Sequence, residues 1–214
     1  MSDTHKDWQD RASRVMNAQD ENEVKEGYDA WASQYDEDHV NFGLLLLTHF
    51  VGMFCRHVPK GSSPILDAGA GTGRLGEALS LHGYGDITGI DLSPGMLEIA
   101  INKPGYTETK VQRLGDRLDF PDNMFPVVAS LGAFAPNLAQ ADAFSELIRV
   151  TQPGGVLVLS MRAGREAETG FNRHRLELEE QGRWQYVDGI DEFISHPELD
   201  PTMRYAIHVY RKSG

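Results

Sequence analysis

Over the first 58 residues, the spacing of apolar side chains is that of helices. Tyr28, Trp31 and Tyr35 are three and four residues apart, so on a helix they share one face. An apolar stripe predicts a core helix over 43–58. The stretch 1–26 is polar and acidic, with few large apolar groups, and predicts a loose arm or a solvated helix.

From residue 59 the pattern changes to short apolar runs that alternate with helical stretches. The short runs predict strands over 64–68, 86–91, 106–113, 126–131, 155–162, 183–195 and 203–211. The helical spacing predicts helices over 73–83, 93–103, 137–151 and 165–182. Alternation of strand and helix favours parallel pairing with helices on both faces, and two final strands without a helix between them favour an antiparallel hairpin.

The predicted fold is therefore α/β and Rossmann-like. It has a seven-stranded, mostly parallel sheet, a C-terminal antiparallel hairpin at its late edge, and helices on both faces. Within one compact domain, we expect residues 1–58 to form an N-terminal helical arm and lid, and residues 59–214 to form the main domain.

Charge and composition narrow the classes of partner. Twenty basic against thirty-two acidic residues give a net charge of −12, which repels a phosphate backbone and argues against nucleic acid. The uncharged run 41–55 is shorter than the ~20 residues of a membrane span, so no membrane association is expected. No secretory signal pattern is visible and there is one cysteine, which together favour a cytoplasmic location.

The stretch ILDAGAGTG, residues 65–73, combines a predicted strand with three glycines before a predicted helix. Glycine permits a tight turn and close approach of a ligand, and the helix N-terminus adds free N–H groups. The next strand ends in Asp91, placed to accept hydrogen bonds from both hydroxyl groups of a ribose. The loop and the acid together indicate a site for an adenosine-bearing ligand.

Two registers of the glycines compete. Gly71, Gly73 and Gly76 satisfy the G-x-G-x-x-G spacing of dinucleotide sites, which would indicate an NAD(P)-dependent oxidoreductase. In the other register Gly69 opens a G-x-G-x-G series, and Asp67 stands two residues before it.

In this second register, DAGAGTG resembles the first motif of class I S-adenosylmethionine-dependent methyltransferases. An acid beside the loop suits the ammonium group of that cofactor and would repel a pyrophosphate. The resemblance continues through ITGIDLSPGMLEIA, GDRLDFPDNMF, PVVASLGAF and RVTQPGGVLVLSMR, in family order over residues 62 to 162. With YDAWASQYD at 28–36, it is nearest to the methyltransferase-like proteins of the Williams–Beuren region.

The resemblance implies a class I methyltransferase fold, S-adenosyl-L-methionine as cofactor and S-adenosyl-L-homocysteine as product. Asp67 would orient the amino acid part, Asp91 the ribose, and Asp116, with Arg117 beside it, the adenine amino group. The cofactor-binding residues that it implies are Tyr28, Trp31, Tyr35, Asp67, Ala68, Gly69, Gly71, Gly73, Asp91, Leu92, Met96, Asp116, Arg117 and Leu131.

The expected activity is methyl transfer to a small, uncharged or cationic acceptor. The histidine pair of many small-molecule relatives is replaced by LGAFAPN, so no catalytic base is assigned. His39 and Asp36, in the lid segment, are the candidates, and no cluster has the spacing of metal ligands. An oxidoreductase and a non-catalytic S-adenosylmethionine-binding module remain as alternatives.

Overall fold

A single central sheet organises the computed structural model, which describes residues 3–41, 45–136, 138–164, 170–197 and 200–214. Its strands are β1 (Ile65–Ala68), β2 (Ile87–Asp91), β3 (Tyr106–Val111), β4 (Phe125–Phe134), β5 (Thr151–Arg162), β6 (Trp184–His196) and β7 (Asp200–Lys212). The sheet has seven strands in the order β3-β2-β1-β4-β5-β7-β6. Pairing is parallel from β3 to β5, and β7 runs antiparallel to both β5 and β6. This confirms the predicted fold and its C-terminal hairpin.

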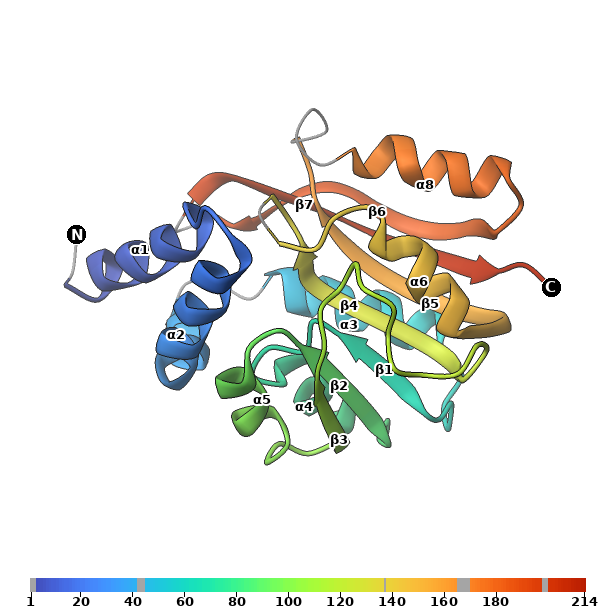
Figure 1. The fold of residues 1–214 in the computed structure, drawn as a ribbon, viewed down its shortest axis with the longest axis horizontal. Helices are drawn as coiled ribbons and strands as arrows, with labels where there is room; N and C mark the ends of the chain where they lie inside the picture. The colour runs from blue at the N-terminus through green and yellow to red at the C-terminus, as the bar shows by residue number, and fades with distance from the viewer. Residues whose placement is uncertain (1–2, 42–44, 137, 165–169, 198–199) are drawn as a thin grey trace.

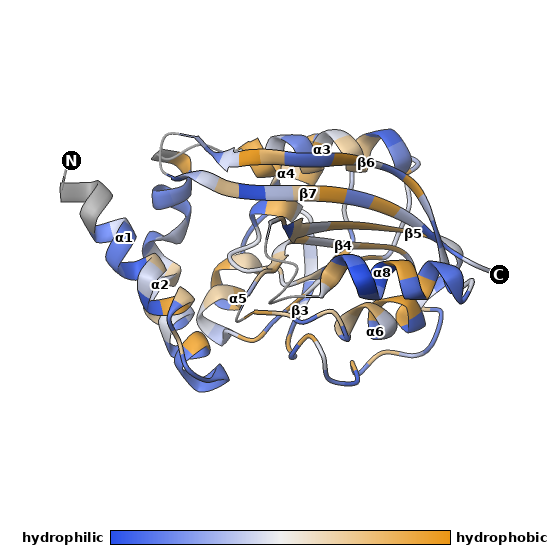
Figure 2. Ribbon diagram, turned by 90° about the horizontal axis from the view of Figure 1, so that it is seen from above, coloured by the Kyte–Doolittle hydropathy of each residue, from blue (hydrophilic) through white to orange (hydrophobic). Residues whose placement is uncertain are grey.

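Helices cover both faces of this sheet (Figure 1). The helices in the described residues are α1 (Asp3–Met16), α2 (Glu21–Asn41), α3 (Leu45–His57), α4 (Arg74–Leu81), α5 (Pro94–Ala100), α6 (Ala143–Val150) and α8 (Phe171–Glu180), of which α1 and α2 lie at one end of the molecule. One buried cluster joins α6 and α8 to the sheet, and a second joins α3, α4 and α5 to its other face. The central strands are accordingly the most hydrophobic part of the ribbon in Figure 2, because both of their faces are covered.

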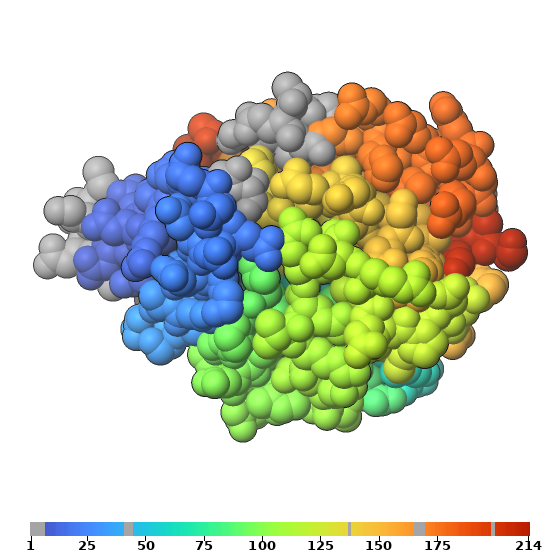
Figure 3. Space-filling view, viewed as in Figure 1, coloured from blue at the N-terminus to red at the C-terminus, as the bar shows by residue number. Residues whose placement is uncertain are grey.

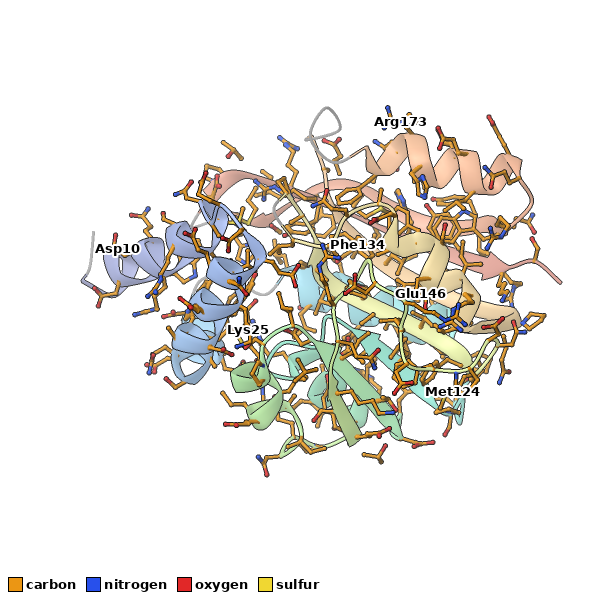
Figure 4. All side chains as sticks on the ribbon, in the orientation of Figure 1. Asp10, Lys25, Met124, Phe134, Glu146 and Arg173 are labelled. Carbon is orange, nitrogen blue, oxygen red and sulfur yellow. The ribbon has the colours of Figure 1, made fainter. Side chains whose placement is uncertain are left out.

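Aromatic side chains fill the core between the sheet and its helices. Phe134, near the end of β4, is fully buried, and its ring centroid lies 4.7 Å from that of Phe144 on α6 (Figure 4). On the other face, Phe50 and Phe54 of α3 are fully buried, which confirms the predicted core helix there. These contacts fix the strand ends from which the site is built.

The N-terminal residues form more than a loose arm or a solvated helix. Val15 on α1 is 1% exposed and packs in a cluster with Val24 and Trp31, which belong to α2. Asp38 of α2 is also buried, and it accepts hydrogen bonds from both Arg11 and the Trp31 indole. Figure 3 shows α1 and α2 in blue at one end of the molecule, against the green segment that includes α5.

Some boundaries differ from the prediction. The helix expected over 137–151 spans only Ala143–Val150, because the apolar residues that face the core begin at Ala143. Its first predicted position, 137, and residues 165–169 of the predicted helix 165–182 lie outside the described residues. β5 starts at Thr151, four residues earlier than expected, since Thr151 pairs with Phe125 before the Pro-Gly-Gly turn.

Candidate active site

The glycine loop joins β1 to α4 at the carboxyl ends of the parallel strands. Gly69, Gly71 and Gly73 all have positive φ angles, of 85°, 53° and 82°. A Cβ atom at Gly69 would lie 2.5 Å from that of Ala133. Both this close approach and the positive φ angle therefore require glycine at position 69. At Gly71 a Cβ would meet nothing within 4 Å, which leaves this part of the backbone open to a ligand.

Gly76 has a packing role that explains its presence. A Cβ atom there would lie 2.3 Å from the ring of Tyr106, which comes from β3. The Gly76 amide donates to the Tyr106 hydroxyl at 3.2 Å, and that hydroxyl donates to Asp67 Oδ2 at 2.5 Å. The glycine spacing that suggested a dinucleotide site therefore serves to admit the tyrosine that holds Asp67.

Asp67 is a buried carboxyl group with one free oxygen. Its residue is 1% exposed, and Oδ1 has no hydrogen-bond partner among the described residues. Burial raises the pKa of Asp67 to about 7, with the nearby Asp91 carboxylate adding to the increase and the Tyr106 hydrogen bond opposing it. A buried acceptor of this kind is stabilised by a cationic donor.

A cavity of about 310 Å³ lies over the tips of β1 and β2. Asp91, at the end of β2, accepts hydrogen bonds from the amides of Gly71 and Ser93, each at 2.9 Å. Leu92 and Met96 supply apolar surface to the same cavity. Because each carboxylate oxygen can accept more than one hydrogen bond, Asp91 retains capacity for hydroxyl groups of a ligand.

Gln112 is a polar residue in the lining of this cavity. It lies one residue after β3, and its Oε1 accepts a hydrogen bond from the Asp119 amide at 2.7 Å. Its Nε2 is buried and has no partner among the described residues. A mostly apolar cavity with few polar groups is typical of sites for small ligands, and its size falls at the lower end of their range.

A second, larger cavity of about 710 Å³ shares the glycine loop with the first. Residues that line both are Tyr28, Tyr35, Gly69, Gly71, Leu131, Gly132 and Leu138. Asp67, Arg74 and Trp31 line only the larger one, which extends to the ends of β5, β6 and β7. The two cavities therefore adjoin each other at the carboxyl ends of the strands.

Two aspartates fix α2 in its position over the loop. Asp29 Oδ1 accepts hydrogen bonds from the Ser93 hydroxyl at 2.5 Å and from the Gly95 amide at 2.9 Å, at the start of α5. Asp36 accepts a hydrogen bond from Thr72 of the glycine loop and pairs with Lys103. These contacts place Tyr28 and Tyr35 at the cavities.

The two candidates for a catalytic base have different surroundings. Asp36 lies outside both cavity linings and is occupied by Thr72 and Lys103. His39 lines the larger cavity, and its Nδ1 lies 2.8 Å from the Tyr35 carbonyl oxygen, so Nδ1 carries the proton and Nε2 is the free acceptor. Burial, and next the Arg74 charge, lower the pKa of His39 to about 3, which makes it a weak proton acceptor.

Several residues expected at the cofactor lie elsewhere. The side chains of Asp116 and Arg117 are 65% and 75% exposed, outside both cavities, and Asp116 pairs with Arg113 instead. Ala68 and Gly73 are covered by the loop and its surroundings rather than exposed to a cavity.

Other residues that line the cavities were not predicted. Gln112 follows β3 and lies between the shared motifs 87–100 and 115–125, so neither motif pointed to it. Arg74 stands directly after Gly73, so the glycine motif could have drawn attention to it. Arg162 ends a predicted strand, which is a further signal in the sequence. His196 has no such signal, because only the hairpin brings it near the loop.

Two kinds of feature are absent from the residues that the structure describes. No group of three or more His, Cys, Asp or Glu side chains in these parts of the chain is placed to hold a metal ion. None of the helices that the structure describes is long and apolar enough to cross a membrane.

Comparison with known proteins places this site in context. Residues 65–155 match a family described as a methyltransferase domain. The chain is 34% identical over 171 residues to human methyltransferase-like protein 27, covering 74% of this chain and 66% of that protein. It is 31% identical over 141 residues to a demethylmenaquinone methyltransferase of Tropheryma whipplei, covering 64% of this chain and 58% of that protein.

A solved structure agrees with the fold. The TehB-like SAM-dependent methyltransferase from Corynebacterium glutamicum superimposes with a TM-score of 0.62 at 23% identity, covering 86% of this chain and 99% of that one. The chain spans about two thirds or less of the length of the two curated relatives. The matched segment, 65–155, contains the glycine loop and Asp91.

Proposed function

The chain belongs to the class I S-adenosylmethionine-dependent methyltransferases, and we propose that it transfers a methyl group from S-adenosylmethionine to a small-molecule acceptor. The observation that carries the proposal is the free, buried Oδ1 of Asp67 beside an open glycine backbone. The cofactor has an ammonium group, which is the donor that this oxygen lacks.

The residues present fit the rest of the cofactor. Asp91 would accept hydrogen bonds from the ribose hydroxyl groups, while Leu92 and Met96 would border the adenine. Gln112 Nε2, buried without a partner, would donate to an adenine nitrogen. The free Nη2 of Arg74 would bind the carboxylate of the amino acid part.

When bound, the cofactor supplies a methyl group already activated on a sulfonium. The protein's task is then to hold the acceptor in line and to exclude water, and such positioning lowers a barrier by ~7–11 kcal/mol. The amino acid part of the cofactor would enter the larger cavity at Asp67 and Arg74, and the remainder of that cavity, beyond the glycine loop and Leu131, is the place for the acceptor. Tyr28 and Tyr35, held by α2, would cover both ligands.

The relatives support a small acceptor and a narrower assignment. One is named for demethylmenaquinone, a small molecule, and the human relative is a methyltransferase-like protein. The narrower assignment is to the methyltransferase-like proteins of the Williams–Beuren region, which YDAWASQYD at 28–36 resembles. Small molecules are the proposed partners of the site.

The dinucleotide alternative lacks a comparable observation. Its third glycine, Gly76, is accounted for by the Tyr106 ring. The free carboxylate oxygen of Asp67 would also oppose a pyrophosphate placed at the same loop. Calorimetric titration with NAD and NADP would reveal an oxidoreductase.

Calorimetric titration of the protein with S-adenosyl-L-homocysteine and, separately, with NAD and NADP tests the cofactor. We expect binding of the first and none of the others. Labelled S-adenosylmethionine with a panel of small acceptors then tests transfer. Heat from a nicotinamide cofactor alone would overturn the proposal, and binding without transfer over a broad panel would favour a non-catalytic module.

A further inference from the structure

The far wall of the larger cavity is formed by the ends of three strands. Arg162 is the last residue of β5, and His196, Asp200 and Tyr205 come from β6 and β7. These strand ends lie at the same end of the molecule as α1 and α2 (Figure 1). The wall is separate in sequence from the glycine loop and is free of the residues assigned to the cofactor.

Arg162 carries a buried, unsatisfied donor. Its Nη1 is inaccessible to solvent and has no hydrogen-bond partner among the described residues, and its guanidinium carbon lies 5.7 Å from the centroid of the Tyr205 ring. No carboxylate of the described residues lies within ion-pair distance, 4.0 Å, of this guanidinium. A planar guanidinium held against a ring favours a planar anion.

The acids that line the cavity are occupied or distant. Asp200 Oδ1 accepts hydrogen bonds from the Thr202 amide at 2.8 Å and from its hydroxyl at 2.6 Å. Asp67 is held at the glycine loop by Tyr106. Asp10 is exposed on α1, at the outer edge of the molecule (Figure 4). Burial alone would raise the pKa of Asp200, whereas its bonds to Thr202 and then the Arg162 charge lower it. Among the described residues, however, no hydrogen bond or ion pair joins any of these acids to Arg162.

Two histidines complete this part of the cavity, with ring centroids 6.0 Å apart. Burial first, and next the Arg74 charge, lower the pKa of His39 to about 3 and that of His196 to about 4, and Arg162 adds to the decrease at His196. Both rings are therefore neutral near pH 7. They add no positive charge to the wall, so that the cations lining this cavity in the described residues are Arg74 at the glycine loop and Arg162 at the far wall.

Resting on the proposed methyl transfer, we infer that the acceptor carries a carboxylate group that pairs with Arg162 on the Tyr205 ring. Such an anchor would hold the acceptor at the far wall while the rest of the molecule reaches the glycine loop. This differs from the small, uncharged or cationic acceptor expected from the sequence, because that expectation did not include a buried, unpaired guanidinium at the cavity wall.

Matched pairs of probes test this inference: 4-hydroxybenzoate against 4-hydroxybenzamide, and 3-mercaptopropionate against 3-mercaptopropionamide. Each is titrated by calorimetry into the protein saturated with S-adenosyl-L-homocysteine. We expect each carboxylate to bind at least about ten-fold more tightly than its amide, as for a charge-assisted hydrogen bond.

Two variants locate the effect. Arg162→Gln should remove the preference for carboxylates and leave the affinity for S-adenosyl-L-homocysteine unchanged, which also shows that the variant folds. Arg211→Gln is the control, since Arg211 lies outside both cavities, pairs with Val156 in the middle of β5 and donates a hydrogen bond to the Gly154 carbonyl oxygen. It should keep the preference.

The inference is overturned if the amides bind as well as the carboxylates, if no carboxylate binds, or if Arg162→Gln retains the preference. Failure of the protein to bind S-adenosyl-L-homocysteine is a separate result, because it removes the proposed function itself. The two failures are therefore distinguishable in the same titrations.

Discussion

Replacing Asp67 by asparagine separates the cost of burying this carboxyl group from its use in binding the cofactor. The two side chains have nearly the same shape, and the asparagine oxygen can still accept the hydrogen bond from Tyr106. The substitution removes the negative charge and replaces the free carboxylate oxygen by an NH2 group, which cannot accept a hydrogen bond. The two consequences have opposite signs and different pH dependences.

The first consequence concerns the stability of the protein without cofactor. The pKa of Asp67 in the folded chain, about 7, is above its ordinary value of 3.8, so its contribution to stability is present below pH 4 and is lost as the pH rises through 7. A shift of about 3 units corresponds to at most about 4 kcal/mol. Relative to the natural protein, Asp67→Asn should therefore gain up to this amount between pH 4 and pH 8.

The second consequence concerns cofactor binding. An ionised Asp67 that pairs with the ammonium group contributes about 1.5–3 kcal/mol, so at pH 7.5 the variant should bind S-adenosyl-L-homocysteine about 10–150-fold more weakly. Binding to the natural protein should weaken by up to about ten-fold per pH unit below 7, because the carboxyl group is then protonated. The variant should show no such dependence.

Urea unfolding from pH 4 to 8 and calorimetry from pH 5.5 to 7.5 measure the two effects. The calorimetric range stops there because α-amino groups begin to lose their proton near pH 8. Asp188→Asn is the control, since Asp188 lies on β6 and pairs with His57 away from the cavities. Equal pH slopes of cofactor affinity in the natural protein and in Asp67→Asn would refute the assignment of the free oxygen to the ammonium group.

Three further substitutions have defined outcomes. Gly76→Ala should lower the free energy of unfolding by about 1–3 kcal/mol in urea, because its Cβ would lie 2.3 Å from the Tyr106 ring; an unchanged value would contradict this packing role. Asp91→Ala should weaken S-adenosyl-L-homocysteine binding about 10–100-fold in calorimetry, and undiminished affinity would remove Asp91 from the ribose site. Asp29→Ala should cost about 1–3 kcal/mol in urea and speed cofactor release in stopped-flow measurements, because it frees α2 from α5, whereas unchanged release would show that α2 is no lid.

The strands and the glycine loop could be predicted because local pattern determines them. The runs that became β1 and β2 are short, mostly apolar and buried on both faces, and the loop glycines stand where the backbone requires positive φ. The early start of β5 was not predicted, because the Pro-Gly-Gly turn at 153–155 looks like a strand boundary in the sequence. Thr151 belongs to the strand only through its pairing with Phe125, 26 positions earlier in the chain.

Burial at the N-terminus depends on a partner helix and is therefore harder to read from the sequence. Val15 stands almost alone in a polar stretch, and only α2 with Trp31 makes it a core residue. The same reason applies to His196 and Arg162, which meet at one wall because β7 lies antiparallel to both of their strands. Long-range pairing of this kind leaves no local period.

The placement of Asp116 shows a different limit. The shared motif that contains Asp116 predicted a contact with adenine, yet its side chain is exposed and Arg113 holds it outside the cavity. Gln112, four residues earlier, instead presents the buried free amide to that cavity. A motif identifies the segment near a ligand, whereas the register of the backbone after β3 decides which side chain reaches it.

The distribution of unsatisfied polar atoms gives the strongest physical reason to regard both cavities as ligand sites. Five buried side-chain atoms of the described residues lack a partner, and four belong to residues that line the cavities: Asp67, Gln112, Arg74 and Arg162. Each such atom costs about 1–3 kcal/mol, which folding elsewhere avoids by pairing. A cofactor and an anionic acceptor would satisfy all four, so binding recovers a cost that the folded chain otherwise carries.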